Sequence, residues 1–409
     1  MNAASRHNHV LAHSTLPLPS PFLLMPRILY FFALCNLVIG SGAFVLGGIL
    51  QPLARDLGIS VAAAGQVMTA YAIATAVFAP VLILLTAKWP RKLVIQLALA
   101  LFTAGNMVSA LANDLTMLLM GRILMGAGAM FTAAVSAYAV TLVVPSLRGR
   151  ALSTAFLGMS ISYAVALPIG AWLGFKYGWH TPVWLCALAS LAALLAATVL
   201  LPNGVLTQSA GFTGFKAAAK QSAVQRVWLR TLLFFIAIFS VFAYVGPVLL
   251  ALNAMSPVQL SVVLAAFGLA GIAGTLLGGW ANDRFGSLAT LSVQLSVLVS
   301  MMSLLPLTQG HLTATVIIMV IWGVAGFGLT APQQSRLVSL SPAQAPLLLS
   351  LNSSMLYAGT ALGAVMSGAV IQSVGLANLS WVGAPFGLAA LGTLWFDRAP
   401  ATNTLAQTV

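Results

Sequence analysis

The sequence contains very few acidic side chains. Its 409 residues hold four acids and no glutamate; the acids are Asp56, Asp114, Asp283 and Asp397. Charged residues of both signs make up only 5% of the chain, too few to cover the surface of a soluble domain of this length. Nor do the residues offer a Ser/His/Asp set or a spacing typical of metal ligands. We therefore expect no enzyme, no metal site and no cofactor.

Cysteine is also scarce, and positive charge is unevenly placed. Cys35 and Cys186 both fall in long apolar runs, so we expect no disulfide. The formal net charge of +13 could suggest a nucleic-acid partner. However, apart from Arg55, Arg122 and Lys176, every Lys and Arg falls in the tails or in loops on one side of the apolar runs. We expect no nucleic-acid partner, and the positive-inside rule predicts that this side and both termini are cytoplasmic.

What the chain has in excess is apolar residues, at 60%. Runs near the length that crosses the hydrocarbon of a bilayer recur along the whole chain. We expect spans at 28–50, 62–85, 93–112, 117–141, 151–174, 179–201, 229–252, 258–281, 288–307, 313–333, 346–372 and 379–396. This pattern predicts an all-α membrane protein with twelve transmembrane helices.

The spans divide into two groups of six. We expect an N-terminal tail at 1–25, a six-helix bundle at 26–201, a cytoplasmic linker at 202–228, a second bundle at 229–397 and a tail at 398–409. Ser256 and Asp283-Arg284 stand in the second half where Ser60 and Ala87-Lys88 stand in the first. Weak internal symmetry between two six-span halves is a known plan of transporters.

One charge lies well inside a predicted span, away from its ends. Arg122 falls in the apolar stretch 118–141, whose Gly121 and Gly126 would let a neighbouring helix approach closely. A guanidinium stays protonated and is costly in lipid. It could extend to the nearer membrane surface, or it could face a polar pathway inside the bundle. We expect Arg122 to face the protein interior.

Several short patterns follow one another in a recognisable order. Gly279-x-x-x-Asp283-Arg284-x-Gly286 closes one span, and a degraded copy in the first half keeps only its positive charges. Arg122-x-x-x-Gly126 lies in the fourth span. The remaining patterns comprise Lys88, Arg91 and Lys92 of the degraded copy, Arg148-Gly-Arg150, and Gly158 with Pro168 and Gly170 in the fifth span. Together they resemble the major facilitator superfamily, most closely its twelve-span drug:proton antiporters of the arabinose-efflux-permease-like group.

The resemblance implies two pseudo-symmetric six-helix bundles that rock about a central site. It also implies a monomer in the bacterial inner membrane that exports small drug-, sugar- or metabolite-like molecules by proton antiport. The conserved patterns would act as gate and conformational motifs, and Asp283 would meet Arg148 or Arg150 when the cytoplasmic side closes. The expected motif residues are Lys88, Arg91, Lys92, Arg148, Arg150, Gly158, Pro168, Gly170, Gly279, Asp283, Arg284 and Gly286.

One departure from the family pattern concerns proton coupling. Ala43 stands where related exporters often carry a glutamate, and the four acids lie at loops or span ends. A carboxylate within the membrane is the usual proton carrier. Coupling could instead use a peripheral group such as His180 or Asp114 through water, or the protein could be a proton-independent facilitator or uptake carrier. A non-transporting sensor built on a transporter fold is the alternative from a different class.

Polar and aromatic side chains near the middle of the spans are the candidates for a substrate cavity, although packing is the better explanation for each aromatic residue taken alone. Pseudo-symmetry in the family would place spans 1, 4, 7 and 10 at the centre. Only Arg122 is cationic, so an anionic or polar substrate group could bind there. The candidates are Asn36, Arg122, Ser136, Tyr163, Tyr244, Trp322, Asn352 and Tyr357.

Overall fold

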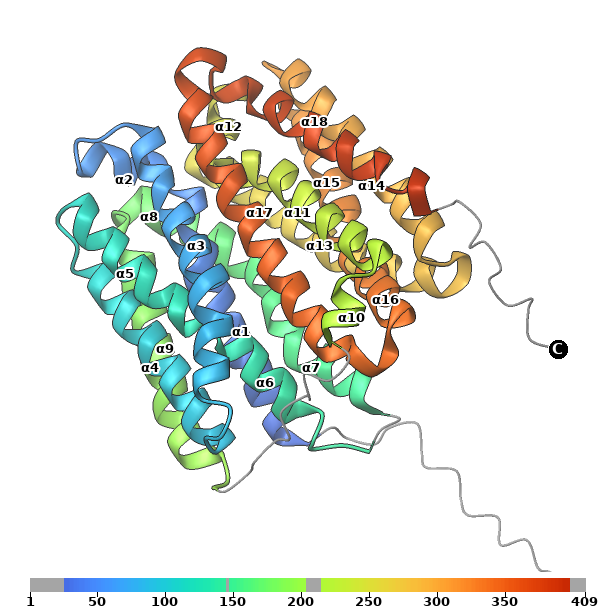
Figure 1. The fold of residues 1–409 in the computed structure, drawn as a ribbon. Coiled ribbons are helices and arrows are strands. Elements are labelled where there is room, and N and C mark those ends of the chain that lie inside the picture. Colours follow the sequence, from blue (N-terminus) through green and yellow to red (C-terminus); the bar gives the residue numbers. More distant parts are fainter. Residues whose placement is uncertain (1–25, 145–146, 204–214, 398–409) are drawn as a thin grey trace, which may run out of the picture.

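The structure is a computed structural model that describes residues 26–144, 147–203 and 215–397. Within these residues it is helical throughout, and twelve helical segments are long and apolar enough to cross a membrane. The predicted all-α architecture with twelve spans is therefore confirmed (Figure 1).

The first half contains spans 1 to 6. These are formed by α1 (Arg27–Phe44) with the short 3₁₀-helix η1 (Val45–Gly48), α3 (Val61–Leu85), α4 (Arg91–Ala110), α5 (Leu115–Gly128) with α6 (Phe131–Ala139), α7 (Arg148–Ile161) with the π-helix η3 (Ser162–Ala166) and α8 (Leu167–Tyr177), and α9 (His180–Leu200). The short α2 (Leu50–Asp56) follows the first span.

The second half repeats this plan. It contains α11 (Ser222–Phe242) with α12 (Val245–Leu252), α13 (Pro257–Phe285), α14 (Ser287–Leu304) with η4 (Leu305–Thr308), α15 (Leu312–Gly328) with α16 (Thr330–Leu340), α17 (Ala345–Val374), and α18 (Leu379–Gly392) with η7 (Trp395–Asp397). The short α10 (Phe215–Ala219) precedes it.

The two halves carry equivalent helix starts and equivalent interruptions. Ser60 caps α3 by accepting a hydrogen bond from the Ala63 amide, and Ser256 caps α13 in a capping box with Gln259. Spans 1 and 7 are both interrupted towards their C-terminal ends, and spans 4 and 10 are each divided into two helices, α5 with α6 and α15 with α16. These matching features support the predicted relation between two six-helix bundles.

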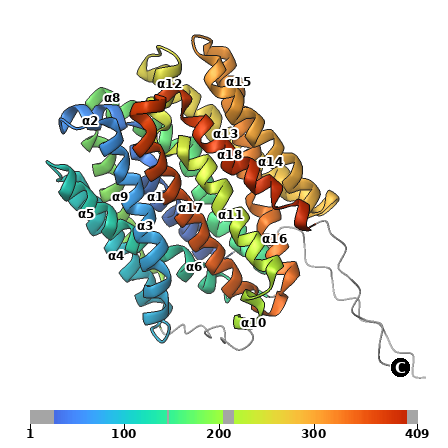
Figure 2. The same ribbon diagram turned by 45° about the horizontal axis from the view of Figure 1, so that its top comes forward.

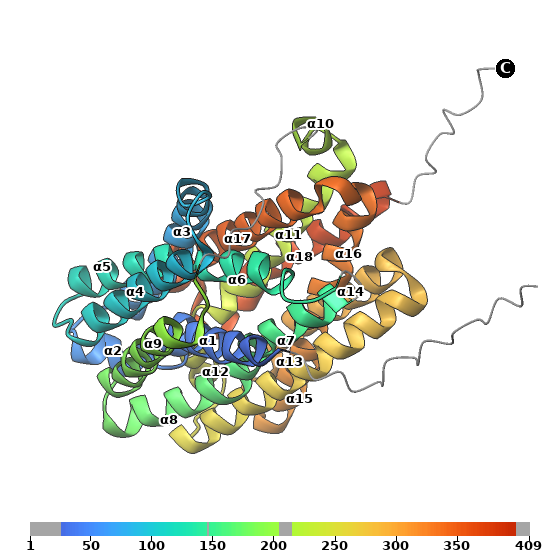
Figure 3. The same cartoon turned by 90° about the horizontal axis from the view of Figure 1, so that it is seen from below.

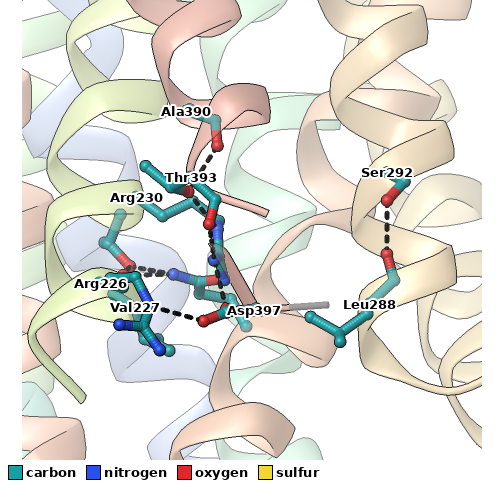
Figure 4. A network of polar contacts seen from close by, with 10 residues as sticks. Arg226, Val227, Arg230, Leu288, Ser292, Ala390, Thr393 and Asp397 are labelled. Carbon is teal, nitrogen blue, oxygen red and sulfur yellow. Dashed lines mark hydrogen bonds and ion pairs between the residues drawn. The ribbon is translucent and has the colours of Figure 1, made fainter. Parts of the chain in front are cut away.

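The seventh span starts earlier than predicted. α11 begins at Ser222, inside the range 202–228 that we expected to be a linker, and α10 lies in that range as well. Arg226 and Arg230 make this stretch look like a loop in the sequence. In the structure both contact Asp397 at the end of the last span, so the helix can continue past the apolar part of α11 (Figure 4).

The two ends of the bundle differ in charge. We call the end that carries Lys88, Lys92, Arg150 and Arg284 the basic face, and the end that carries α2 and α12 the opposite face. In Figures 1 and 2 α2 and α12 lie together towards the top, with the opposite face. Across the bundle, α3 packs against α17 and α8 packs against α13 (Figure 3).

The contacts between the halves lie at mid-depth and at the opposite face. At mid-depth, Phe44 of α1 contacts Phe239 and Phe242 of α11. At the opposite face, a Cβ on Gly246 would lie within 3 Å of the backbone of Gly48, so spans 1 and 7 cross there almost backbone to backbone. The described structure is therefore closed at the opposite face.

Candidate functional site

Arg122 lies inside the first bundle. Its side chain is 1% exposed, and Nη1 donates a hydrogen bond of 2.7 Å to the backbone carbonyl of Gly42 on α1. Its Nε and Nη2 atoms have no hydrogen-bond partner among the described residues. The guanidinium thus turns inward and does not extend to the membrane surface, in agreement with the expectation that it faces the protein interior.

Small residues around Arg122 bring neighbouring helices close. A Cβ on Gly121 would lie 2.7 Å from the Gly105 carbonyl of α4, and a Cβ on Gly126 would lie 2.7 Å from the Tyr71 carbonyl of α3. Helices α3 and α4 are therefore packed directly on α5. This packing leaves the arginine side chain no route to lipid and fixes the position of its guanidinium.

Tyr71 is a neighbour of Arg122 that the sequence did not single out. It lies on α3, is 2% exposed and is close enough to Arg122 for the two side chains to interact electrostatically. Its ring meets that of Tyr357 on α17 edge to face, with centroids 6.4 Å apart. In the sequence Tyr71 is a lone tyrosine in an apolar run, a signal that core packing explains equally well.

Aromatic rings from both halves gather beside this pair. Tyr163, in the π-helix of the fifth span, stacks on Phe44 at 4.9 Å and meets Phe327 of α15 edge to face at 4.8 Å. The cluster continues through Phe242 and Phe267 to Trp322, and Phe267 and Trp322 lie 5.8 Å apart. Tyr163 and Phe327 are partly exposed, whereas Trp322 is buried at 1% exposure and packs behind them.

The structure brings three of the eight predicted cavity residues together. Tyr71 is the residue they share: its ring meets that of Tyr357, and Arg122 and Tyr163 both lie within electrostatic range of it at the boundary between the halves. This group combines one cation with tyrosine hydroxyls and aromatic walls. It can hold an anionic or polar group beside an apolar body.

Four of the other predicted residues make contacts elsewhere. Asn36 is fully buried and donates 2.8 Å to the Ala155 carbonyl, which ties α1 to α7. Ser136 donates to the Thr132 carbonyl of its own helix. In the second bundle the Asn352 side chain accepts a hydrogen bond from Thr231, and Tyr244 is buried in the seam between α3 and α17.

The predicted gate residues of the second half are exposed at the basic face. Asp283 accepts a hydrogen bond of 3.3 Å from its neighbour Asn282, and Arg284 lies over the Phe285 ring. Gly286 ends α13 with φ +80°, a conformation that favours glycine. Arg150 is exposed, and the side chain of Arg148 lies outside the described residues. Because the described state is closed at the opposite face, the expected contact of Asp283 with Arg148 or Arg150 stays a prediction for the other state.

The remaining motif residues lie at the first-half turn and in the fifth span. Lys88 is exposed, Lys92 partly exposed and Arg91 buried. A side chain on Gly158 would overlap the Ala33 carbonyl, and one on Gly170 would overlap Val45. Both glycines therefore permit α1 and the fifth span to touch. The buried Pro168 begins α8 directly after the π-helix, and Gly279 has open space where a side chain would stand.

The peripheral titratable groups hold loops at the opposite face. The Asp56 carboxylate accepts a hydrogen bond of 2.8 Å from the Trp179 indole, and Asp114 caps α5 through the Met117 amide. His180 Nε2 lies 3.1 Å from the Ala112 carbonyl. Each group therefore has a structural contact at a helix end.

One acid has a buried side chain, which no pattern in the sequence indicates. The Asp397 carboxylate lies 2.6 Å from Nη2 of Arg230 and 2.8 Å from Nε of Arg226, and Thr393 accepts a hydrogen bond from Nε of Arg230 (Figure 4). The side chains of Asp397 and Arg230 are both 0% exposed. This ion pair fastens the end of the last span to α11, away from Arg122.

Comparison with known proteins places these features in a family. The family model described as Major Facilitator Superfamily matches residues 32–345 and 255–407. The MFS-type transporter YbcL of Bacillus subtilis (strain 168) is 29% identical over 359 residues, which cover 87% of this chain and 92% of the relative. The inner membrane transport protein YdhP of Escherichia coli (strain K12) is 31% identical over 346 residues, which cover 82% of this chain and 88% of the relative.

A solved structure gives the same result for the fold. The crystal structure of a bacterial homologue of the human lysosomal transporter Spinster, in an inward-facing and occupied conformation, has a TM-score of 0.77 to this chain. The similarity covers 90% of this chain and 96% of that one at 15% sequence identity.

Proposed function

The chain belongs to the Major Facilitator Superfamily of membrane transporters, and from this premise we propose that it exports small organic molecules with an anionic or polar group by alternating access. The substrate would bind between the two bundles, next to Arg122. The basic face would lie in the cytoplasm, as the positive-inside rule predicts, and the protein would work as a monomer in the bacterial inner membrane.

The observation that carries this proposal is the incomplete hydrogen bonding of Arg122. Two of its nitrogen atoms lack a partner among the described residues although the side chain is 1% exposed. A buried guanidinium left this way is unfavourable, and a carboxylate or phosphate oxygen accepts its hydrogen bonds in a planar, paired geometry. Tyr71, Tyr163 and Tyr357 would add hydroxyl groups and aromatic surface for the rest of the molecule.

Proton antiport is the coupling mode that the span-5 pattern favours. The interior offers no carboxylate near Arg122 in the described residues, because Asp397 pairs with two arginines at the basic face. A proton would then have to use a peripheral group such as His180 or Asp114 through water. The alternatives are a proton-independent facilitator or uptake carrier, and a non-transporting sensor.

Transport by the purified protein in proteoliposomes tests the proposal. A panel of radiolabelled organic anions, cations and neutral sugars would be offered to the wild type, Arg122→Gln and Arg122→Lys. We expect selective movement of anions, a loss of at least about 100-fold in Arg122→Gln, and partial activity in Arg122→Lys, which keeps the charge but not the planar fork. Arg55→Gln, at an exposed position in the last turn of α2 on the opposite face, is the matched control.

The outcomes separate the alternatives. Transport of anions that Arg122→Gln leaves unchanged would refute the role of Arg122. Movement only down a gradient would favour the facilitator. No movement of any probe by a protein that is folded and correctly inserted would favour the sensor.

A further inference from the structure

The closed opposite face contains one aromatic side chain that sits between the two halves. We propose that Tyr244 is the latch of this face: its ring occupies a slot formed by two glycines from opposite halves and must leave that slot when the face opens. From the sequence we expected Tyr244 to be a residue of the substrate cavity, and in the structure its hydroxyl contacts α3 and α17. The inference rests on the alternating access proposed above but not on any substrate.

Tyr244 is bonded to both halves at once. It belongs to the second half, in the break between α11 and α12, and is 0% exposed. Its hydroxyl lies 3.4 Å from the carbonyl of Ala62 on α3 and 3.3 Å from the carbonyl of Ala364 on α17. The hydrogen bond to Ala62 crosses from the second bundle to the first.

The slot exists because two glycines lack side chains. A Cβ on Gly65 of α3 would overlap the ring and hydroxyl of Tyr244, and a Cβ on Gly368 of α17 would lie 2.6 Å from the hydroxyl oxygen. The hydroxyl end of the ring therefore lies directly on the backbone of a helix from the other bundle. No larger residue than glycine fits at position 65 while Tyr244 holds this place.

The chain break that positions Tyr244 is also fixed locally. Pro247 lies in the first turn of α12, where a proline is tolerated but cannot continue a helix from α11. Just after the break, Gly246 lies against the backbone of Gly48 in the first half. The latch and the crossing of spans 1 and 7 are therefore one unit.

Opening of the opposite face must separate α3 from this unit. The ring would lose its contact with Gly65 and the hydroxyl its bond to Ala62, because α3 and Tyr244 belong to different bundles. A buried aromatic side chain covers roughly 150–250 Å² of surface. Exposing this surface is unfavourable, so the need to remove the ring from the slot stabilises the closed state. Residues that fill or empty the slot should therefore change the ratio of open to closed molecules.

Pulsed electron paramagnetic resonance measures this ratio without a substrate. Spin labels at Asn113→Cys and Gln309→Cys, exposed on opposite-face loops of the two halves, report the distance across the face, with Cys35 and Cys186 replaced by alanine. We expect Tyr244→Ala to raise the open fraction about tenfold.

Gly65→Ala is the second variant, and it tests the latch without removing a buried side chain. Alanine strengthens a helix relative to glycine, so this variant should fold at least as well as the parent. Its methyl group overlaps the Tyr244 ring, so we expect it to raise the open fraction as well. In a Tyr244→Ala background the slot is empty, and Gly65→Ala should then have no further effect.

Tyr138→Ala is the matched control for the loss of a buried ring. Tyr138 is also 0% exposed, but its ring packs on Phe32 within the first half. Tyr138→Ala should leave the open fraction unchanged, and Tyr244→Phe, which keeps the ring, should raise the open fraction only a few-fold.

The possible results all bear on the latch. Parent-like distances in both Tyr244→Ala and Gly65→Ala would overturn it, and so would an equal shift in Tyr138→Ala. The proposed function fails separately: if Tyr244→Ala shifts the distances while no organic anion is transported, the latch stands and the substrate proposal does not.

Discussion

Removing the charge of Asp397 tests how the end of the last span is held. Asp397→Asn keeps the size of the side chain but leaves Arg230, which is 0% exposed, without a counter-charge. Removal of one partner from a buried ion pair costs about 3–5 kcal/mol. Arg226 is 30% exposed, so its bond to Asp397 is screened by solvent and contributes little, on the order of 0.2–1 kcal/mol.

The amide of asparagine can still accept one hydrogen bond from Arg230, which offsets part of the loss. We therefore expect Asp397→Asn to lower the free energy of unfolding by about 2–4 kcal/mol. The assay is unfolding of the purified protein in detergent, followed by the fluorescence of its tryptophans. Asp283→Asn is the matched control, because Asp283 is exposed and makes no ion pair within the described residues.

A double variant separates a charge effect from a packing effect. If the unpaired charge of Arg230 causes the loss, Asp397→Asn together with Arg230→Met should be more stable than Asp397→Asn alone, because the uncompensated charge is gone. Equal stabilities of Asp397→Asn and Asp283→Asn would refute the reasoning, because the buried pair would then contribute nothing measurable.

The sequence was sufficient to predict the fold because hydrocarbon imposes a strong and simple rule. Spans must be long and apolar, and twelve such runs were visible in the sequence and are present in the described structure. The start of the seventh span was missed because Arg226 lies in its first turns, with Arg230 close behind it. Only the fold brings Asp397 to them, across 171 and 167 residues of chain.

The site was predictable in part, for a related reason. Arg122 could be found because a charge in an apolar run is costly, and this cost is visible in the sequence alone. Tyr71 and Phe44 could not be found, because an aromatic residue is as suitable for packing as for a binding site. The surroundings of Tyr244 could not be predicted either: its ring lies against Gly65 and Gly368, and no local pattern connects these three positions.

Three further predictions test separate parts of the structure. Gly158→Leu should prevent folding or insertion, because a side chain there overlaps the Ala33 carbonyl where α1 crosses α7; the yield of monodisperse protein measures this. Trp179→Phe should lower stability by about 1 kcal/mol in the same unfolding assay, because the Asp56 carboxylate loses the indole donor. The last prediction concerns energy coupling, for which a proton needs a group that can change its charge. Asp56, Asp114 and His180 each hold a helix end at the opposite face. If these groups carry the coupled proton, changing all three together with His311 should abolish uphill movement of the substrate driven by a pH gradient. The measurement is uptake of the anion found by screening, in proteoliposomes with an imposed pH gradient. Uphill movement that survives the fourfold change would exclude these peripheral groups, whereas its absence in the wild type would support a facilitator.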